Sequence, residues 1–278
     1  MPEVKKEIAK ELIEEHVEVS ISRACRLIQV HRSYYYYDQK RDDSEVEDAI
    51  RSASEFEEGF WKIYKRLRKE GYPWNHKKVY RVYKKIHYNK RSRLKKRLPA
   101  RIKNPLVTPI LPNDTWSLDF VSDRLESGRQ FRVLNVLDDF NREAVAQEIS
   151  MSMPTQRMIK LLEKVIWLKG KPSAIRTDNG PEFISKEMDS WCKANDIQHI
   201  FTQPGKPTQN SYIERFNGSY RRAVLDAYIF RSLSEARELT ERWMEDYNER
   251  RPDEALGDMS PIEYKNNFYK NEQLVISN

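Results

Sequence analysis

The sequence predicts an α/β protein in which a mixed β-sheet flanked by helices follows small all-α units. From Asp114 onward, runs of strand-like alternation are interleaved with helical periods in the order β-β-β-α-β-α-β-α. Before residue 87 the periodic segments have the spacing of helices, and a stretch with four prolines separates the two regions. The change of period therefore marks the start of the main folded core.

Two helical units precede that core. Residues 1–40 carry a helical stripe that includes Leu12 and Ile13, a second helix in "SISRACRLIQV", and an Arg- and Tyr-rich third segment. This order indicates a helix-turn-helix-like unit that contacts DNA, with a plain three-helix packing unit as the alternative. Three further helical patterns, interrupted by "Gly-Tyr-Pro", form a basic helical unit that we expect to bind DNA. The predicted domains are thus 1–40, 41–98, a linker over 99–112, a core with C-terminal helices over 113–268, and a tail over 269–278.

The composition excludes several classes of protein. The hydrophobic fraction is 38% and the mean hydropathy is −0.85, but the 11% of aromatic residues argue against disorder. No apolar run approaches the length of a membrane span, and the amino end has no signal-peptide core. Two cysteines far apart in sequence, Cys25 and Cys192, fit a reducing compartment and exclude a Cys-rich zinc site. We therefore expect a cytoplasmic protein without a membrane partner.

The positive charge is concentrated in one segment. Residues 60–105 contain 18 Lys and Arg but one acid, Glu70, whereas the rest of the chain has 32 basic and 42 acidic residues. Such a segment is either a solvated linker or a surface that contacts the phosphate backbone of DNA. We favour the second interpretation, because a solvating run rarely excludes the opposite sign so completely. The candidate DNA-binding residues here are Lys84, Lys85, Lys95, Lys96 and Arg97.

Each element of the core has its own pattern. "TWSLDFVSD" alternates as a strand, and "FRVLNVLDDFNREAVAQEI" predicts a hairpin that turns at residues 139–142. A helix over 155–169, the strand "SAIRTD", a helix near 184–194 and the strand "IQHIFT" follow. Two long helices, from about Thr208 and over 233–249, complete the core. The first of these has an apolar stripe formed by Ile213, Phe216, Tyr220, Val224 and Ala227.

Three carboxylates lie where the predicted elements would bring them together. Asp119 is in the middle of a strand, where an unpaired carboxylate is costly. Asp178 ends another strand just before an Asn-Gly-Pro turn, at the sheet edge where α/β proteins bind ligands. Glu214 lies in a polar stripe with Asn210, Asn217 and Arg221, at the border of the apolar stripe. The adjacent acids Asp138 and Asp139 fall at the hairpin turn, and we interpret them as ordinary turn residues.

A divalent cation would offset the repulsion among these carboxylates. Mg²⁺ prefers oxygen ligands, and two ions can together support phosphoryl transfer. The pattern therefore indicates a site for Mg²⁺ or Mn²⁺, with two ions expected. Taken singly, Asp119 could be a satisfied strand residue, Asp178 a turn residue and Glu214 a surface residue. No cluster of His and Cys competes for the metal, since His199 stands alone and is expected to be structural.

Three segments resemble a known family. "WSLDFVSD", "RTDNGPEF" and "PGKPTQNSYIERFNGSYR" are similar to the catalytic motifs of DDE transposases with a retroviral-integrase-like core. More narrowly, the chain resembles the second-reading-frame (OrfB) subunit of bacterial insertion sequences of the IS-three family, from "SISRACRLI" to "MSPIEY". The resemblance implies a ribonuclease H-like core whose metal ligands and catalytic residues are Asp119, Asp178 and Glu214, acting on the DNA ends of the element.

The resemblance also implies contacts and partners. Arg221 matches a basic residue that contacts DNA in the family, and we expect Gln209, Asn210, Asn217 and Arg222 to face DNA near it. Double-stranded DNA of the element ends and of the target is the expected substrate, bound by a homo-oligomer. A first-reading-frame (OrfA) protein is a candidate partner or fusion. Two positions depart from the family pattern: Ala223 replaces an acid, and Asp253 replaces a histidine. A non-catalytic DNA-binding protein and a nuclease without strand joining are the alternatives.

Overall fold

The structure, a computed structural model, describes residues 2–16, 18–36, 42–54, 56, 59–88, 109–202 and 210–276. The chain divides into two compact units, Met1–Glu45 and Val46–Asn278. The first contains the helices α1 (Pro2–Glu15), α2 (Ile21–Leu27) and α3 (Arg32–Tyr35). The small side chains of Ala9 and Ala24 are fully buried where α1 packs on α2. Small residues at this contact let the two helices approach closely.

A mixed sheet forms the centre of the second unit. In the described part of the chain it has five strands in the order β3-β2-β1-β4-β5. β1 pairs antiparallel with β2 and parallel with β4, and β5 adds a further parallel strand. The predicted mixed sheet is therefore confirmed. Its strands are β1 (Thr115–Arg124), β2 (Gln130–Asp138), β3 (Ala144–Ser150), β4 (Ala174–Thr177) and β5 (Gln198–Phe201).

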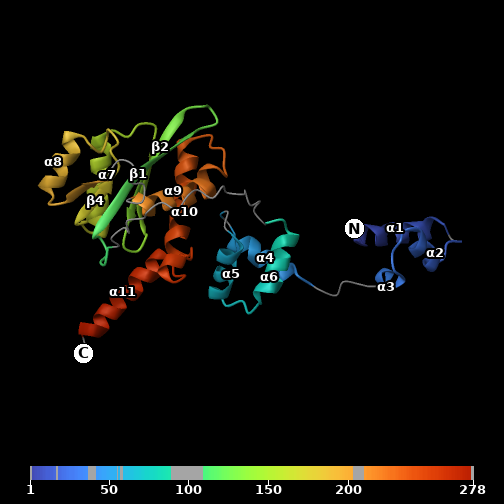
Figure 1. Ribbon diagram of the computed structural model, residues 1–278. Helices are drawn as coiled ribbons and strands as arrows, with labels where there is room; N and C mark the ends of the chain where they lie inside the picture. Colours follow the sequence, from blue (N-terminus) through green and yellow to red (C-terminus); the bar gives the residue numbers. More distant parts are fainter. Residues whose placement is uncertain are drawn as a thin grey trace, which may run out of the picture. The chain divides into compact units, whose positions relative to one another are not determined.

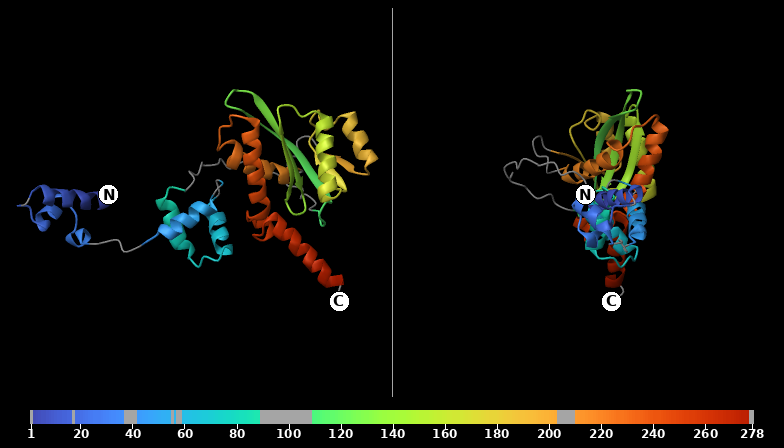
Figure 2. Two further views of the ribbon diagram at one scale, coloured as in Figure 1. Left: turned by 180° about the vertical axis from the view of Figure 1, so that it is seen from behind. Right: turned by 90° about the vertical axis from the view of Figure 1, so that its right-hand side faces the viewer.

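Helices cover both faces of the sheet (Figures 1 and 2). The helices α7 (Thr155–Lys169) and α8 (Lys186–Ala194) pack on one face, and α9 (Ser211–Tyr220) and α10 (Leu233–Glu249) on the other. The alternation of β1 supplies both layers. Trp116 and Leu118 enter the α7–α8 layer, whereas Val121 enters the α9–α10 layer. Asp119 shares the face of Val121, so β1 directs it toward α9.

The helix that carries Glu214 does not remain α-helical to its end. After Tyr220 it continues as a π-helix, η2 (Arg221–Leu225), and it ends at Asp226. Ile213, Phe216, Tyr220 and Val224 are buried as predicted, but Ala227 is exposed. The prediction for Ala227 was wrong because the wider π-turn breaks the 3.6-residue period and the helix stops before that residue.

Three helices, α4 (Ser44–Ala53), α5 (Phe60–Lys69) and α6 (His76–Lys85), form a small core of their own around Ile50, Ile63 and Val82. The basic face of α5 also makes ion pairs with residues much later in the chain. Arg66 binds Asp246 of α10 through two hydrogen bonds, and both side chains are buried. Part of the basic charge predicted to contact DNA is therefore paired within the protein.

The hairpin between β2 and β3 turns where the sequence predicts, but its acids are not ordinary turn residues. Asp138 and Asp139 are both fully buried. Asp138 accepts hydrogen bonds from the backbone N–H groups of Asn113 and Phe140. Asp139 pairs with Arg176 and accepts a hydrogen bond from the Ser117 hydroxyl. The interpretation from sequence was wrong about their environment, because long-range contacts bury this turn.

The last helix packs on the same turn. α11 (Pro261–Ile276) follows the short 3₁₀ helix η3 (Glu254–Leu256). Phe140 of the turn contacts the rings of Tyr264 and Phe268. The helix extends through most of the stretch 269–278 that the sequence predicts as a tail.

Some predictions fall on residues outside the described ranges. Gln209, Lys95, Lys96 and Arg97 are among them, as is most of the predicted linker. Within the described ranges, none of the helices combines the length and the apolar character that a membrane crossing requires.

Candidate active site

The sheet register places Asp119 and Asp178 at the same level of neighbouring strands. In the parallel pair β1–β4, Ser117 lies opposite Arg176. Two residues further along each strand come Asp119 and Asp178, and the period of two directs each side chain to the same face as the preceding pair. Asp119, in the middle of β1, therefore lies at the same level of the sheet and on the same face as Asp178, just beyond the end of β4.

The segment 176–183 shows why that strand ends as it does. Thr177 is buried and its hydroxyl contacts Nε2 of His199 at 3.0 Å, whereas Asp178 is exposed. Oδ1 of Asp178 accepts a hydrogen bond from the backbone N–H of Gly180 at 2.9 Å. A Cβ atom at Gly180 would lie only 3.0 Å from this oxygen, so glycine permits the close approach. Phe183 then anchors the turn in the core.

Glu214 provides the third carboxylate from α9, which packs on β1 and β2. It is exposed, next to the buried Ile213. Burial, together with the negative charges of Asp178 and Glu214, raises the pKa of Asp119 to about 6, against the lowering effect of the hydrogen bonds from Phe120 and Asn217. The three carboxylates therefore act on one another electrostatically, although they come from three separate elements.

A chain of three hydrogen-bonded amide side chains ends at the carboxylate of Asp119. Asn217 of α9 donates from Nδ2 to Oδ2 of Asp119 at 2.7 Å, and its Oδ1 accepts from Nδ2 of Asn135 at 2.7 Å. Oδ1 of Asn135 in turn accepts from Nε2 of Gln147 at 2.8 Å. Every amide thus points its N–H₂ group toward the carboxylate, and the chain links β3, β2, α9 and β1. This direction favours an ionised Asp119.

The sequence reasoning missed Asn135 and Gln147. Asn135 is fully buried in the middle of β2, between the apolar residues Leu134 and Val136. A polar residue in the middle of an apolar strand was the signal that identified Asp119, and the same signal was present here. Only the register of β2 against β1, which sets Asn135 opposite Asp119, could show that the two belong to one site.

The carboxylate oxygens of Asp119, Asp178 and Glu214 are ligands that suit a hard cation, but the three groups do not lie close together. Among the residues that the structure describes, no group of three or more His, Cys, Asp or Glu side chains is gathered closely enough to hold a metal ion. The three carboxylates repel one another, which opposes closer approach in the absence of a counter-charge. His199 belongs to a separate contact, since its ring packs against Phe201.

The residues expected to face DNA are in different situations. Asn210 is buried just before α9, and Asn217 holds Asp119. Arg221 donates to the carbonyl oxygen of Ser122 at 2.9 Å, so part of its guanidinium serves the protein itself.

The other basic candidates lie on helix surfaces. Arg222 is exposed near Ser219. The ammonium group of Lys84 lies 4.9 Å from the ring centroid of Tyr80, and Lys85 pairs with Glu47 at 2.8 Å. The structure therefore gathers Asn210, Asn217 and Arg221 around α9, whereas Lys84 and Lys85 belong to α6.

Comparison with known proteins gives consistent results. The chain matches the family described as "Integrase core domain" over residues 111–207 and again over 195–261. A 31.7 kDa protein of insertion element IS407 from Burkholderia multivorans is 38% identical over 256 residues, which cover 91% of this chain and 92% of that protein. InsK, the predicted transposase of insertion sequence element IS150 from Escherichia coli, is 24% identical over 90% of this chain and 94% of its own length.

The fold also has a counterpart among solved structures. A chain of the simian T-cell lymphotropic virus intasome, in complex with PP2A regulatory subunit B56 gamma, superposes with a TM-score of 0.50 at 19% identity. The match covers 72% of this chain and 69% of that one. The likeness confirms the predicted ribonuclease H-like fold.

Proposed function

Because the chain belongs to the bacterial insertion-sequence transposases with an integrase-like core, and so acts in DNA transposition, we propose that Asp119, Asp178 and Glu214 are its catalytic carboxylates. The observation that carries the proposal is the placement of the three acids: the register of β1 against β4 sets Asp119 and Asp178 at the same level, and α9, which carries Glu214, packs on β1. The charges of Asp178 and Glu214 accordingly contribute to the raised pKa of Asp119, after burial itself. Three acids from separate elements that converge in this way are costly unless their charge is used.

The three carboxylates would hold Mg²⁺ or Mn²⁺, and we propose two ions. Carboxylate oxygens are the ligands that these cations prefer, and the amide chain keeps Asp119 oriented toward the site. When bound, the metal supplies activation of the attacking oxygen and stabilisation of the leaving oxygen in phosphoryl transfer. The protein contributes the position of the ligands and, through Asn217, a hydrogen bond that favours the ionised form of Asp119.

The reaction that fits is a pair of transfers at phosphorus. In the first, the oxygen of water forms a bond to a phosphodiester at the element end, and the 3′-oxygen leaves with a proton as a hydroxyl group. In the second, that 3′-hydroxyl forms a bond to a phosphodiester of the target DNA, and the bond from this phosphorus to its own 3′-oxygen breaks. We propose double-stranded DNA of the element ends and of the target as substrates, a homo-oligomer as the active form, and a first-reading-frame protein as a partner.

Several side chains support contacts with that DNA. Asn210, Arg221 and Arg222 lie on or next to α9. Arg221 donates to Ser122 and lies 3.5 Å from the exposed carboxylate of Asp226, and we propose that a DNA phosphate competes with that carboxylate for its guanidinium. Lys84 and Lys85, and Gln209, Lys95, Lys96 and Arg97 outside the described residues, complete the proposed DNA-binding set. Ala223, which replaces an acid of the family pattern, is buried in the core and is not one of the three proposed carboxylates.

Charge-removing variants test the assignment. Asp178→Asn and Glu214→Gln should remain folded and bind DNA, yet lose Mg²⁺-dependent cleavage and joining of element-end duplexes by about a thousandfold or more. Glu238→Gln on the exposed face of α10 is the matched control and should retain full activity.

Two results would count against the proposal. Cleavage retained by Glu214→Gln would exclude the triad. Absence of both reactions in the unmodified protein would favour the non-catalytic DNA-binding alternative, whereas cleavage without joining would favour a nuclease.

A further inference from the structure

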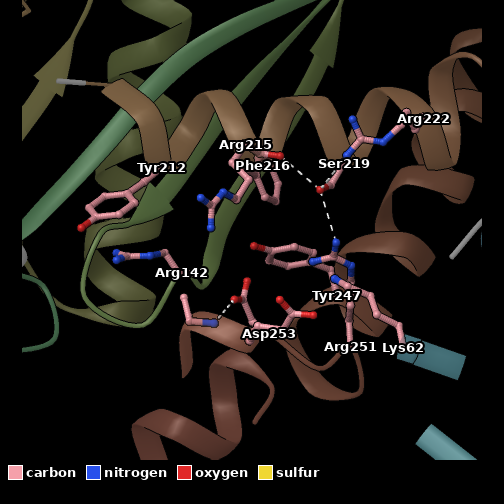
Figure 3. Close-up of a pocket in the computed structure, with 12 residues that line it drawn as sticks. Lys62, Arg142, Tyr212, Arg215, Phe216, Ser219, Arg222, Tyr247, Arg251 and Asp253 are labelled. Carbon is pink, nitrogen blue, oxygen red and sulfur yellow. Dashed lines mark hydrogen bonds between the residues drawn. The ribbon is translucent and has the colours of Figure 1, made fainter. Parts of the chain in front are cut away.

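A cavity of about 260 Å³ opens beside α9, on a flank that the proposed catalytic residues do not use (Figure 3). Tyr212, Arg215 and Ser219 of α9 line it, together with the end of α10 and the turn that follows. At about 100° per residue, this flank lies nearly opposite to Glu214 and Asn217 on the helix surface. The cavity and the carboxylates are therefore two separate places.

Positive charge dominates the lining of the cavity. Five of its side chains are basic and two are acidic, and the basic ones come from five different elements and turns. Ser219 lies between two of them, since its hydroxyl oxygen accepts from Arg222 at 3.4 Å and from Arg251 at 3.3 Å. An anion in this cavity would meet several guanidinium groups at once. The basic residues are Lys62, Arg142, Arg215, Arg222 and Arg251.

Arg142 is the most informative of these residues. Its Nη1 atom is buried and has no hydrogen-bond partner in the described part of the chain. Buried polar atoms almost always have partners, and an unsatisfied charged donor is costly. The residue is held with φ of +63°, a conformation rare outside glycine, and its guanidinium lies 3.3 Å from the ring centroid of Tyr212. The fold thus fixes a donor at the cavity without giving it an acceptor.

The pKa of Tyr247, which lines the cavity, also reflects the positive charge around it. Burial, together with the negative charge of Asp253, raises the pKa of Tyr247 to about 12, while the positive charges of Arg251, Arg142 and Arg215 act to lower it. Its hydroxyl points into the cavity beside Arg215 and Asp253 (Figure 3). The three guanidinium groups therefore converge on one volume rather than lying scattered over the surface.

We propose that this cavity binds a phosphate group of a nucleic-acid backbone, with Arg142 and Arg215 as its principal donors. Planar guanidinium groups match the paired oxygens of phosphate, and the orphan donor of Arg142 supplies the clearest demand for one. Because the cavity lies on the opposite flank of α9, the bound phosphate belongs to a stretch of nucleic acid away from the scissile phosphodiester. The inference rests on the proposed function, since it takes DNA as the ligand.

Asp253 gives the proposal a second, opposite test. Its carboxylate lines the cavity and also accepts a hydrogen bond from the backbone N–H of Ala255 at 2.8 Å. Asn in this position keeps the acceptor but removes the negative charge that opposes an anion. Asp253→Asn should therefore strengthen phosphate binding, where Arg215→Ala weakens it.

The experiment measures binding of a labelled random-sequence DNA duplex to the full chain by fluorescence anisotropy over a range of salt concentrations. Arg215→Ala should weaken binding about tenfold and make the slope of log K against log salt shallower by about one. Asp253→Asn should tighten binding. The matched control is Arg129→Ala in the exposed turn after β1, which removes the same charge and should change neither quantity. Equal effects of Arg215→Ala and Arg129→Ala would overturn the proposal.

Two further ligands identify the source of the phosphate. If inorganic phosphate raises the melting temperature of the unmodified chain but not of Arg215→Ala, and duplex binding is unchanged in that variant, the site is for a free anion and the proposal fails. Polyglutamate is the second ligand. If Arg215→Ala loses binding to polyglutamate but keeps its binding to the DNA duplex, the cavity binds an acidic protein partner and the proposal is likewise overturned. Failure of the proposed function has a different result: either Glu214→Gln cleaves DNA as well as the unmodified chain does, or the unmodified chain does not cleave DNA at all, whatever the binding result for Arg215→Ala.

Discussion

Asp119 depends on neighbours that are distant in sequence. Its two oxygens accept from the backbone of Phe120 and from Asn217, and the second hydrogen bond continues through Asn135 to Gln147. Each amide in this chain can satisfy the next only in one orientation, because its carbonyl oxygen is used as an acceptor and its N–H₂ group as a donor. The orientation of Asp119 is therefore set by three amide side chains that are not among the proposed metal ligands.

The amide chain leads to a graded prediction at this scale. Replacement by Leu should reduce joining activity about a hundredfold at Asn217, about tenfold at Asn135 and less than about threefold at Gln147, because each step is further from Asp119. The concentration of Mg²⁺ at half-maximal activity should rise in the same order. A uniform loss of stability with an unchanged Mg²⁺ requirement, measured by melting and by activity titration, would show that the amides are only structural.

At the scale of elements, a buried carboxylate joins the hairpin turn to two helices. Glu143 accepts from Lys265 of α11 at 2.9 Å and from Lys169 of α7 at 3.1 Å. Burial alone would raise the pKa of Glu143, but the two lysines together hold it below its usual value of 4.5. A folded-state pKa below the unfolded one means that the ionised form stabilises the fold. That stabilisation is present above the unfolded pKa and is lost as the pH falls through the folded one.

The pH dependence of stability should therefore change in Glu143→Gln. The variant should lose about 1–3 kcal/mol of unfolding free energy at pH 7, since it loses charged hydrogen bonds. Between about pH 5 and about pH 3, its melting temperature should fall less steeply than that of the unmodified chain. Glu148→Gln, which removes a partly exposed pair with Arg157, serves as the control and should leave the pH profile nearly unchanged. Parallel pH profiles for Glu143→Gln and the unmodified chain would contradict the assignment.

At the scale of the whole molecule, charge is divided between a basic segment and an acidic remainder. Residues 60–105 carry 18 Lys and Arg and one acid. In the described part of that segment, Arg66 is buried against Asp246 and Lys85 pairs with Glu47. A basic residue that already has a partner in the protein releases fewer counterions when DNA binds. The unequal availability of these charges has a measurable consequence.

The salt dependence of DNA binding should differ between variants of Lys95, Lys96 and Arg97 and variants of Lys84 and Lys85. Replacing Lys95, Lys96 and Arg97 by Ala should make the slope of log K against log salt shallower by about 2.7, or about 0.9 for each phosphate that the variant no longer neutralises. Replacing Lys84 and Lys85 should change it by less than about 1.8, because Lys85 is paired. The control is the triple replacement of Lys160, Lys164 and Lys186, exposed lysines of the core, by Ala, which should leave the slope nearly unchanged. An unchanged slope in the first variant would identify the segment as a linker.

The sequence by itself determined the order of the elements and singled out the three carboxylates that we propose as catalytic. Both follow from local regularities: the change of period at Asp114, an acid in the middle of the strand at 119, an acid before a turn at 178, and a polar stripe one flank away from Ile213 and Phe216. Such patterns are visible without tertiary contacts because strand and helix geometry fix which side chains share a face.

Only the tertiary structure decided which other residues belong with them. Asp139 became a buried partner of Arg176, Asn135 became part of the support of Asp119, and Arg142 became a donor at a cavity. Ala227 left the core because a π-turn, which the 3.6-residue period does not anticipate, ended the helix before it. Burial and hydrogen-bond pairing depend on segments tens of residues apart in sequence. A local sequence pattern specifies on which face of a strand or helix a side chain lies, but only the packed fold determines which residues that face contacts.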